Sequence, residues 1–155
     1  MTTVKARTAS SGTGAALLSL RVLALLLGVF FLFQGLNKLP WLADSSILAE
    51  RLENWERNAT APSVRAYLET FARPGVPLFA RVIPLAELST ALSLILGFWP
   101  RLFAPLAFVM VCNFHFALGD FYTIEFLRDG AGLPVLGGLL AIVIGGARLP
   151  WSVRP

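Results

Sequence analysis

The segment from Leu17 to Leu39 is a continuous apolar run, and it limits the possible folds more than any other part of the sequence. A helix rises about 1.5 Å per residue, so about 20 apolar residues cross the hydrocarbon core of a bilayer. The run therefore predicts a first transmembrane helix. Three further apolar runs, over residues 78–99, 102–118 and 130–147, predict three more spans, and the last of them is the weakest by length.

These runs are continuous, whereas the strands of a membrane barrel alternate between apolar and polar residues. We therefore predict an all-α fold, an integral membrane bundle of four transmembrane helices. The chain has 155 residues, 56% hydrophobic and 14% charged, whereas a soluble domain carries about 25% charge. Lipid must cover part of this surface, and we expect one membrane domain over 1–155 with a polar tail over 1–14.

The first connection, residues 40–77, is predicted to be a structured loop outside the membrane. Its first half places four apolar residues at helical spacing, and its second half, after Pro62, repeats such a stripe; the first stripe is Ile47, Leu48, Leu52 and Trp55. We expect two short amphipathic helices that lie on the membrane or over the bundle. An exposed charged loop is the alternative.

Basic residues predict the orientation of the chain by where they lie, since their number, six on the side of the termini and seven on the side of the first loop, does not decide it. Six of them lie on the side of the termini, in short segments where the positive-inside rule is most reliable: Lys5, Arg7, Arg21, Arg101, Arg148 and Arg154. We therefore place both termini in the cytoplasm and expect a bacterial inner membrane. The net charge of +4 is explained by this topology, so no nucleic-acid partner is predicted.

Polar residues of the predicted spans gather in the half of the bilayer that faces the first loop. They are Gln34, Asn37 and Lys38 at the end of span one, Glu87 near the middle of span two, and Asn113, His115 and Asp120 at the end of span three. A charged carboxylate in hydrocarbon must be paired, hydrated or protonated. By depth, the candidate partners of Glu87 are His115, Asn113, Gln34 and Lys38. Glu87 is either a proton-carrying or ligand-binding group or an interhelical hydrogen bond that holds the bundle together.

His115 is the sole histidine of the chain. It could titrate, ligate a metal or a pigment magnesium, or donate a hydrogen bond to a quinone carbonyl, although a structural hydrogen bond is the alternative. It is also the sole candidate ligand for a pigment or haem, which a larger complex would have to supply. No residue lies at a metal-ligand spacing from it, and the single Cys112 excludes a dithiol pair or a thiolate cluster. We therefore predict no metal site and no intrinsic cofactor.

Small residues predict where the helices pack closely. Gly28 and Gly35 lie seven residues apart on one face of the first span, and Gly137, Ala141 and Gly145 form a small-xxx-small row in the fourth. Such rows let helices approach each other in lipid. Helix packing is therefore the role predicted for these five residues.

Three segments resemble the DoxX-like family of small membrane proteins. The first holds Gly28-Val29-Phe30-Phe31-Leu32 and Gly35-Leu36-Asn37-Lys38-Leu39, the second holds Glu87, Gly97 and Arg101, and the third is Gly145-Gly146-Ala147-Arg148-Leu149. The long first loop resembles the larger thiosulfate:quinone oxidoreductase-type, or DoxD-like, relatives. The resemblance implies a four-helix membrane protein linked to quinone-coupled oxidation of sulfur or thiol compounds.

Two functions follow from these observations. The first is a quinone-interacting oxidoreductase subunit with a pocket among Gln34, Lys38, Glu87, Asn113 and His115, in which Glu87 or His115 exchanges protons with the quinone. The chain carries no evident electron-transfer centre, so a partner subunit would supply it. The second is a non-catalytic accessory subunit of a respiratory or photosynthetic membrane complex. A transporter is disfavoured because the two halves show no inverted repeat and no paired broken helices.

Overall fold

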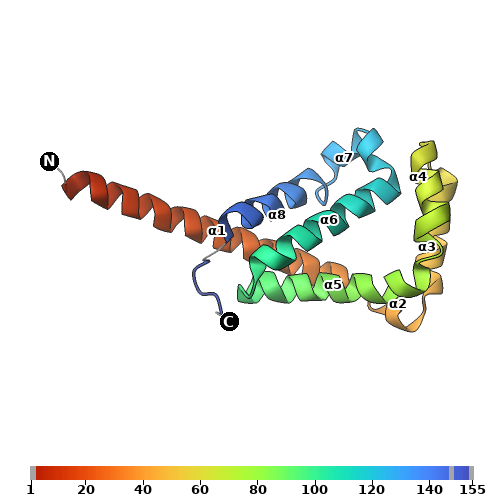
Figure 1. Cartoon of the computed structure of the whole chain (residues 1–155), viewed down its shortest axis with the longest axis horizontal. Helices are drawn as coiled ribbons and strands as arrows, with labels where there is room; N and C mark the ends of the chain where they lie inside the picture. Colours follow the sequence, from red (N-terminus) through yellow and green to blue (C-terminus); the bar gives the residue numbers. More distant parts are fainter. Residues whose placement is uncertain (1–2, 147–148, 154–155) are drawn as a thin grey trace.

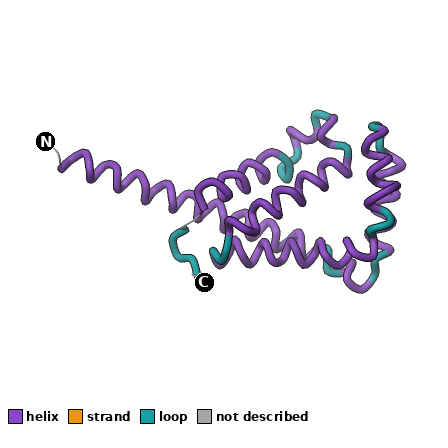
Figure 2. Tube along the Cα trace, in the orientation of Figure 1, coloured by secondary structure: helices purple, strands orange, loops and turns teal. Residues whose placement is uncertain are grey.

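The computed structural model of the chain describes residues 3–146 and 149–153, with the backbone alone for residues 3–13 and for Tyr122. Figure 2 shows that the described residues form helices joined by short loops, with no strand among them. The prediction of an all-α fold is confirmed.

Four helices form the body of the molecule: α1 (Thr3–Asn37), α5 (Val76–Leu96), α6 (Pro100–Leu118) and α8 (Leu133–Gly145). Helix α1 packs against α5 and α8, and α6 packs against the same two helices, so the four close into a ring (Figure 1). Fully buried side chains of all four, such as Phe31, Leu94, Ala104 and Leu139, fill its centre. Phe33, Leu85, Val109 and Ile144 stay exposed, as expected for helices surrounded by lipid.

The first helix is longer than the sequence analysis predicted. It begins at Thr3, so it includes most of the segment that we expected to be a tail over 1–14. No proline occurs before Pro40, so every residue of this segment has the backbone N–H that helical hydrogen bonding requires. Figure 1 shows the N-terminal part of α1 extending well beyond the other helices.

The fourth helix is shorter than predicted. Helix α8 has 13 residues, which at about 1.5 Å per residue span about 20 Å, less than the roughly 30 Å of a hydrocarbon core. Pro134 in its first turn and Gly145-Gly146 at its end confine it, so it does not fill residues 130–147. Within the described residues, three helices are long and apolar enough to cross a membrane: Gly14–Ala43, which adds the next short helix to α1, Val76–Leu96 and Pro100–Leu118.

The first connection contains both of the helices expected there. After the single turn of α2 (Pro40–Ala43) come α3 (Ser46–Asn58) and α4 (Pro62–Tyr67), and a π-helical turn over Leu68–Ala72 leads towards α5. Asp44, which lies just before the N-cap residue Ser45, accepts a hydrogen bond of 2.9 Å on Oδ1 from the backbone N–H of Ser46, the first residue of α3. Figure 1 shows α3 and α4 lying across one end of the bundle.

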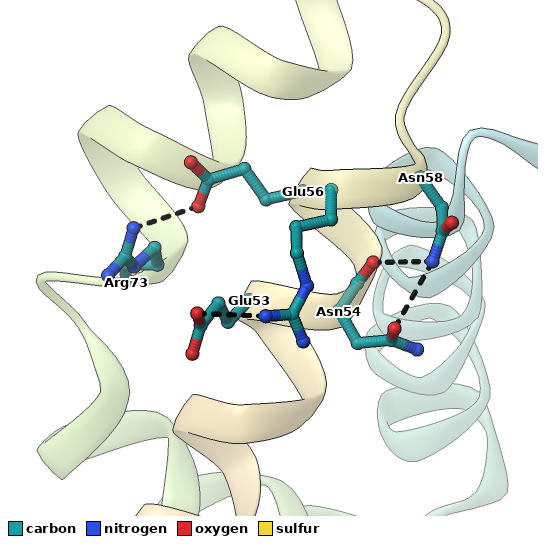
Figure 3. A network of polar contacts seen from close by, with 6 residues as sticks. Glu53, Asn54, Glu56, Asn58 and Arg73 are labelled. Atoms are coloured by element: carbon teal, nitrogen blue, oxygen red, sulfur yellow. Dashed lines mark hydrogen bonds and ion pairs between the residues drawn. The ribbon is translucent and has the colours of Figure 1, made fainter.

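A second apolar core fixes these loop helices to the bundle. Their buried residues, among them Trp41, Leu52 and Leu68, pack with Ala80 of α5 and Ala117 of α6. Figure 3 shows polar contacts of these loop segments, among them the ion pair in which Arg73 Nη1 lies 3.0 Å from Glu56 Oε2. Arg57 Nη1 lies 3.1 Å from Glu53 Oε1, and both of these side chains are exposed. Exposed ion pairs contribute about 0–1 kcal/mol each, so the apolar contacts hold the loop in place. The bundle therefore has a structured cap at this end.

Two arginines close helix ends at the opposite end of the bundle. The guanidinium of Arg21 donates to the carbonyl oxygens of Leu94 and Ile95, at 2.9 and 2.6 Å. Arg101 donates to those of Val143 and Ile144, at 3.1 and 3.2 Å. The last carbonyls of a helix have no partner within the helix, so both arginines satisfy acceptors that hydrocarbon would leave unpaired.

The connection between α6 and α8 lies at the capped end, near the loop helices (Figure 1). It holds a 3-10 turn over Asp120–Tyr122 and the single turn of α7 (Glu125–Arg128), neither of which the sequence analysis predicted. Both are too short to show a hydrophobic period, which explains why they were missed. This connection places the polar residues Asp120 and Asp129 at the end of the bundle that the loop helices cover.

Candidate functional site

Two glycines bring α1 and α5 into close contact. A Cβ atom on Gly28 would lie 2.7 Å from Ile95 Cγ1 and 3.1 Å from the backbone nitrogen of Ile95. A Cβ atom on Gly35 would lie 2.8 Å from Leu88 Cγ. Neither position has room for a side chain, so both glycines allow the backbones to approach. The contact at Gly35 sets α1 directly beside the segment of α5 that carries Glu87.

The row predicted in the fourth span is only partly in contact with neighbouring helices. Gly145 faces Leu20, because a Cβ atom there would lie 2.5 Å from Leu20 Cδ1. Gly137 is exposed and a Cβ atom on it would meet no atom within 4 Å, whereas the adjacent Gly138 faces Leu23 and Leu27. Ala141 is half-buried. At this point in α8 the glycine that packs against α1 is Gly138 and not the predicted Gly137. Neighbouring positions of a helix point about 100° apart, so only one of the two can face α1.

Lys38 and Glu87 form a buried ion pair at the centre of the site. Lys38 Nζ lies 2.7 Å from Glu87 Oε1 and 2.8 Å from Oε2, and it donates a further hydrogen bond of 3.1 Å to Gln34 Oε1. The side chains are 11% and 3% exposed for Lys38 and Glu87. Among the four partners proposed for Glu87, Lys38 is the one in direct contact. Pairing offsets the large cost of removing each charge from water.

Aromatic rings surround the ammonium group of Lys38. Its Nζ atom lies 5.6 Å from the ring centre of Phe114 and 5.9 Å from that of Trp41, within the range of a cation–π contact. Burial and the negative ring faces both favour a fixed position for this group. The Lys38 side chain is therefore held between α1, α2, α5 and α6.

A cavity of about 180 Å³ opens beside this ion pair. Its polar lining consists of Gln34, Lys38 and Glu87 together with His115, Asp129 and Arg51. The other lining residues are apolar or aromatic: Phe30, Phe31, Trp41, Trp55, Val111, Phe114, Leu118 and Ala131. We call this space the polar cavity. It combines a charged pair, an amide and flat aromatic walls, which suits a flat molecule with polar atoms at its edge.

His115 lines the same cavity but is held by its own loop. Its Nε2 atom lies 3.3 Å from the carbonyl oxygen of Ala131, and its Nδ1 atom lies 3.5 Å from Asp120 Oδ2. The rings of Phe121 and Phe126 pack on it, at 6.0 and 5.2 Å between ring centres. His115 therefore lines the same cavity as the ion pair, but its own polar contacts are with Ala131 and Asp120.

Three predicted site residues lie away from the ion pair. Asn113 is exposed and accepts a hydrogen bond of 2.6 Å from the hydroxyl of Tyr67. Asn37 is exposed at the end of α1, and Asp120 is half-buried beside His115, so neither is among the residues that line the polar cavity. The single pocket expected from the sequence is thus divided between two faces of α6.

The face of α6 that carries Asn113 borders a second, larger cavity. Its volume is about 510 Å³, and its walls come mainly from apolar side chains of α3, the π-helical turn, α5 and α6. We call it the apolar cavity. Trp55 and Phe114 line both cavities. Burial raises the pKa of the Tyr67 hydroxyl at its rim, so this group stays protonated and donates to Asn113 at neutral pH.

Several residues that line the polar cavity were not predicted from the sequence, among them Trp41, Arg51, Asp129 and Ala131. Trp41 follows Pro40 directly, and a proline is common at the first position of a helix, so Pro40 was a usable signal for the short helix α2 that carries Trp41. Asp129 gave no comparable signal, because it reaches the site only through the turn that follows α7.

Comparison with known proteins gives one family match. The DoxX family model matches residues 16–119, a region that includes α1 from its apolar part onwards, the loop helices, α5 and α6. No curated protein and no solved structure matches the chain. The match includes the Lys38–Glu87 pair and His115, and it ends just before Asp120.

Proposed function

The chain belongs to the DoxX family of integral membrane proteins, and we propose that it is a subunit that binds the headgroup of a quinone in the polar cavity. The observation that carries this proposal is the buried Lys38–Glu87 pair in the wall of an aromatic cavity. A quinone ring is flat and apolar with two carbonyl oxygens at its edge. The Gln34 amide nitrogen is a donor for such an oxygen, and Phe114 and Trp41 supply faces for the ring. The three N–H groups of Lys38 already face Glu87 and Gln34, so Lys38 contributes its positive charge to the cavity wall.

The apolar cavity supports the same ligand class. Membrane quinones carry a long hydrocarbon tail, and the apolar cavity next to the headgroup site has room for part of one. Trp55 and Phe114 lie between the two spaces, because both residues line each of them. We therefore propose that the tail enters between α5 and α6, beneath the loop helices.

In this proposal the chain supplies binding and protons, whereas a partner subunit supplies electrons. Reduction of a quinone to a quinol takes two electrons and two protons. The electrons would come from a redox centre of the partner that oxidises a sulfur or thiol compound, since the single Cys112 cannot perform dithiol exchange. One proton passes through Glu87, whose carboxylate lies in the cavity wall and can be reloaded through Lys38 or water, and the second comes from water.

We assign this proton exchange to Glu87 rather than to His115. The two ring nitrogens of His115 face Ala131 and Asp120, both in the connection between α6 and α8. Glu87 instead belongs to the pair that faces the proposed ring site. His115 then acts as part of the cavity wall.

Titration with a short-chain benzoquinone tests the binding site in the purified protein. Trp41 and Trp55 line the polar cavity, so we expect saturable quenching of tryptophan fluorescence as the quinone binds. Glu87→Gln keeps the shape of the side chain but removes its charge and its ability to exchange a proton. We expect this variant to bind the quinone at least tenfold more weakly and to lose any quinone that co-purifies with the protein.

Glu53→Gln is the matched control, because Glu53 lies on the exposed face of α3 and pairs with Arg57 outside both cavities. It should bind the quinone as the unmodified chain does. Equal quinone affinity of the Glu87→Gln and Glu53→Gln proteins would refute the role proposed for Glu87.

A non-catalytic accessory subunit of a larger respiratory or photosynthetic membrane complex is the second candidate function. It is favoured by the N-terminal part of α1, which extends beyond the other helices of the chain (Figure 1). Partner subunits of a membrane complex would pack along this part of the helix. A pigment or haem would then belong to those subunits, with His115 as the one histidine of this chain that could ligate it.

Mild solubilisation of native membranes tests this second function. We expect the chain to co-purify with its partners at a fixed stoichiometry, and we expect removal of residues 3–13 to abolish this association while the bundle stays folded. A stable isolated monomer that binds quinone saturably, and binds it more weakly in the Glu87→Gln variant, would contradict the accessory role and favour the first proposal.

A further inference from the structure

Three potential metal ligands meet in the connection between α6 and α8. A ring nitrogen of His115 and one carboxylate oxygen each of Asp120 and Asp129 all lie within 4.8 Å of one another. They come from the end of α6, the 3-10 turn that follows it, and the turn after α7. The fold of this connection therefore gathers residues that are up to 14 positions apart in the sequence.

The His115 ring is oriented as a metal ligand would be. A carbonyl oxygen only accepts hydrogen bonds, so the contact of 3.3 Å with Ala131 requires that Nε2 carries the proton. In the neutral ring Nδ1 then has a free lone pair. Nδ1 is buried without a hydrogen-bond partner in a side chain that is only 4% exposed, and it faces Asp120 Oδ2 at 3.5 Å.

Ala131 also orients the second carboxylate. Its backbone N–H donates a hydrogen bond of 2.9 Å to Asp129 Oδ1, while its carbonyl accepts from His115. Metal-ligating histidines commonly donate their other ring N–H to a backbone carbonyl, and ligating carboxylates are themselves hydrogen-bonded. One residue thus provides both supporting contacts of the cluster.

We propose that His115 Nδ1 and the carboxylates of Asp120 and Asp129 bind a divalent transition-metal ion such as Zn²⁺. One imidazole and two carboxylates are a ligand set that such ions accept. Bonds of about 2.0–2.2 Å in a tetrahedral arrangement place two ligands of one ion about 3.3–3.6 Å apart, so side-chain rotations that draw the three ligand atoms together by about 1 Å would close the observed cluster around an ion. Asp120 is 25% exposed, which leaves access for water as a further ligand.

A metal here would fix the wall of the polar cavity. His115 and Asp129 line this cavity, and the ion would tie the end of α6 to the turn before α8. It would also balance the two carboxylate charges beside the membrane. This site stands on its own geometry and does not depend on whether the cavity binds a quinone.

Zinc binding by the purified chain, with any affinity tag removed, tests the proposal. After treatment with a chelator, we expect titration with Zn²⁺ to reach one ion per chain, counted by elemental analysis, and to raise the unfolding temperature. Asp120→Asn and Asp129→Asn keep the size of each side chain, and each should weaken Zn²⁺ binding at least tenfold. His115→Gln should abolish the stoichiometric site.

Glu125→Gln provides the matched control. Glu125 lies in α7 of the same connection but pairs with Arg128 in an exposed position, so its loss should leave Zn²⁺ binding unchanged. Thermal unfolding without metal shows whether each variant is folded. Failure of the folded unmodified chain to bind one Zn²⁺ would overturn the proposal, and so would equal binding by the folded Asp129→Asn and Glu125→Gln proteins.

Discussion

Replacing Lys38 by methionine is expected to lower the stability of the protein more than any other single change of charge. The substitution keeps an unbranched side chain that is one heavy atom shorter, but it leaves the Glu87 carboxylate, 3% exposed, without its ion pair. Removal of one partner of a buried pair costs about 3–5 kcal/mol. At about 2–4 °C per kcal/mol for a chain of this size, the unfolding temperature should fall by roughly 6–20 °C. Thermal unfolding of the purified protein, followed by circular dichroism, measures this shift.

Two further variants separate the ion pair from general damage. Arg57→Met removes an ion pair of the exposed surface, which is worth about 0–1 kcal/mol, so its unfolding temperature should change by only a few degrees. The double variant Lys38→Met with Glu87→Leu removes both buried charges and should recover most of the lost stability. If Lys38→Met unfolds at the same temperature as Arg57→Met, the pair is not the buried interaction that the structure describes.

The position of this pair shows what the sequence could and could not predict. Apolar runs alone predicted α1, α5 and α6, because a bilayer imposes a length and a composition on any helix that crosses it. Depth along the helices also predicted that Gln34, Lys38, Glu87 and His115 would lie near one another. Depth alone left four partners open for Glu87, since it does not fix how each helix is rotated about its axis.

Rotation separates Asn113 from His115. Each residue turns a helix by about 100°, so two positions two residues apart point in nearly opposite directions. Asn113 consequently faces Tyr67 and the apolar cavity, whereas His115 faces the connection that follows α6. A single pocket that held both residues was therefore excluded by helix geometry, although their depths are similar.

Asp129 illustrates a different limit. It lies in the turn between α7 and α8, and it approaches His115 where the rings of Phe126 and Phe121 pack on the histidine ring. Neither hydrophobic periodicity nor a local motif encodes such a contact, because it depends on how the whole connection folds back. Candidate ligands of this kind emerge only from the three-dimensional arrangement.

Replacing Gly35 by valine is expected to disrupt the contact between α1 and α5 and, with it, the polar cavity. A Cβ atom at this position would lie 2.8 Å from Leu88 Cγ and 3.2 Å from the backbone nitrogen of Leu88. The side chain of Leu88 can move, but its backbone can move only with α5. Overpacking of this kind costs about 1–3 kcal/mol and sometimes more.

The same displacement should reach the ion pair, because Glu87 precedes Leu88 and Lys38 lies one turn after Gly35. We expect Gly35→Val to lower the unfolding temperature by roughly 2–12 °C and to weaken quinone binding in the fluorescence titration. Gly137→Val is the matched control, since that glycine is exposed and a Cβ atom on it meets nothing within 4 Å. Its stability and its quinone affinity should both match the unmodified chain. Equal stability of the two valine variants would mean that α1 and α5 do not meet at Gly35, and the approach that holds Lys38 beside Glu87 would need another cause.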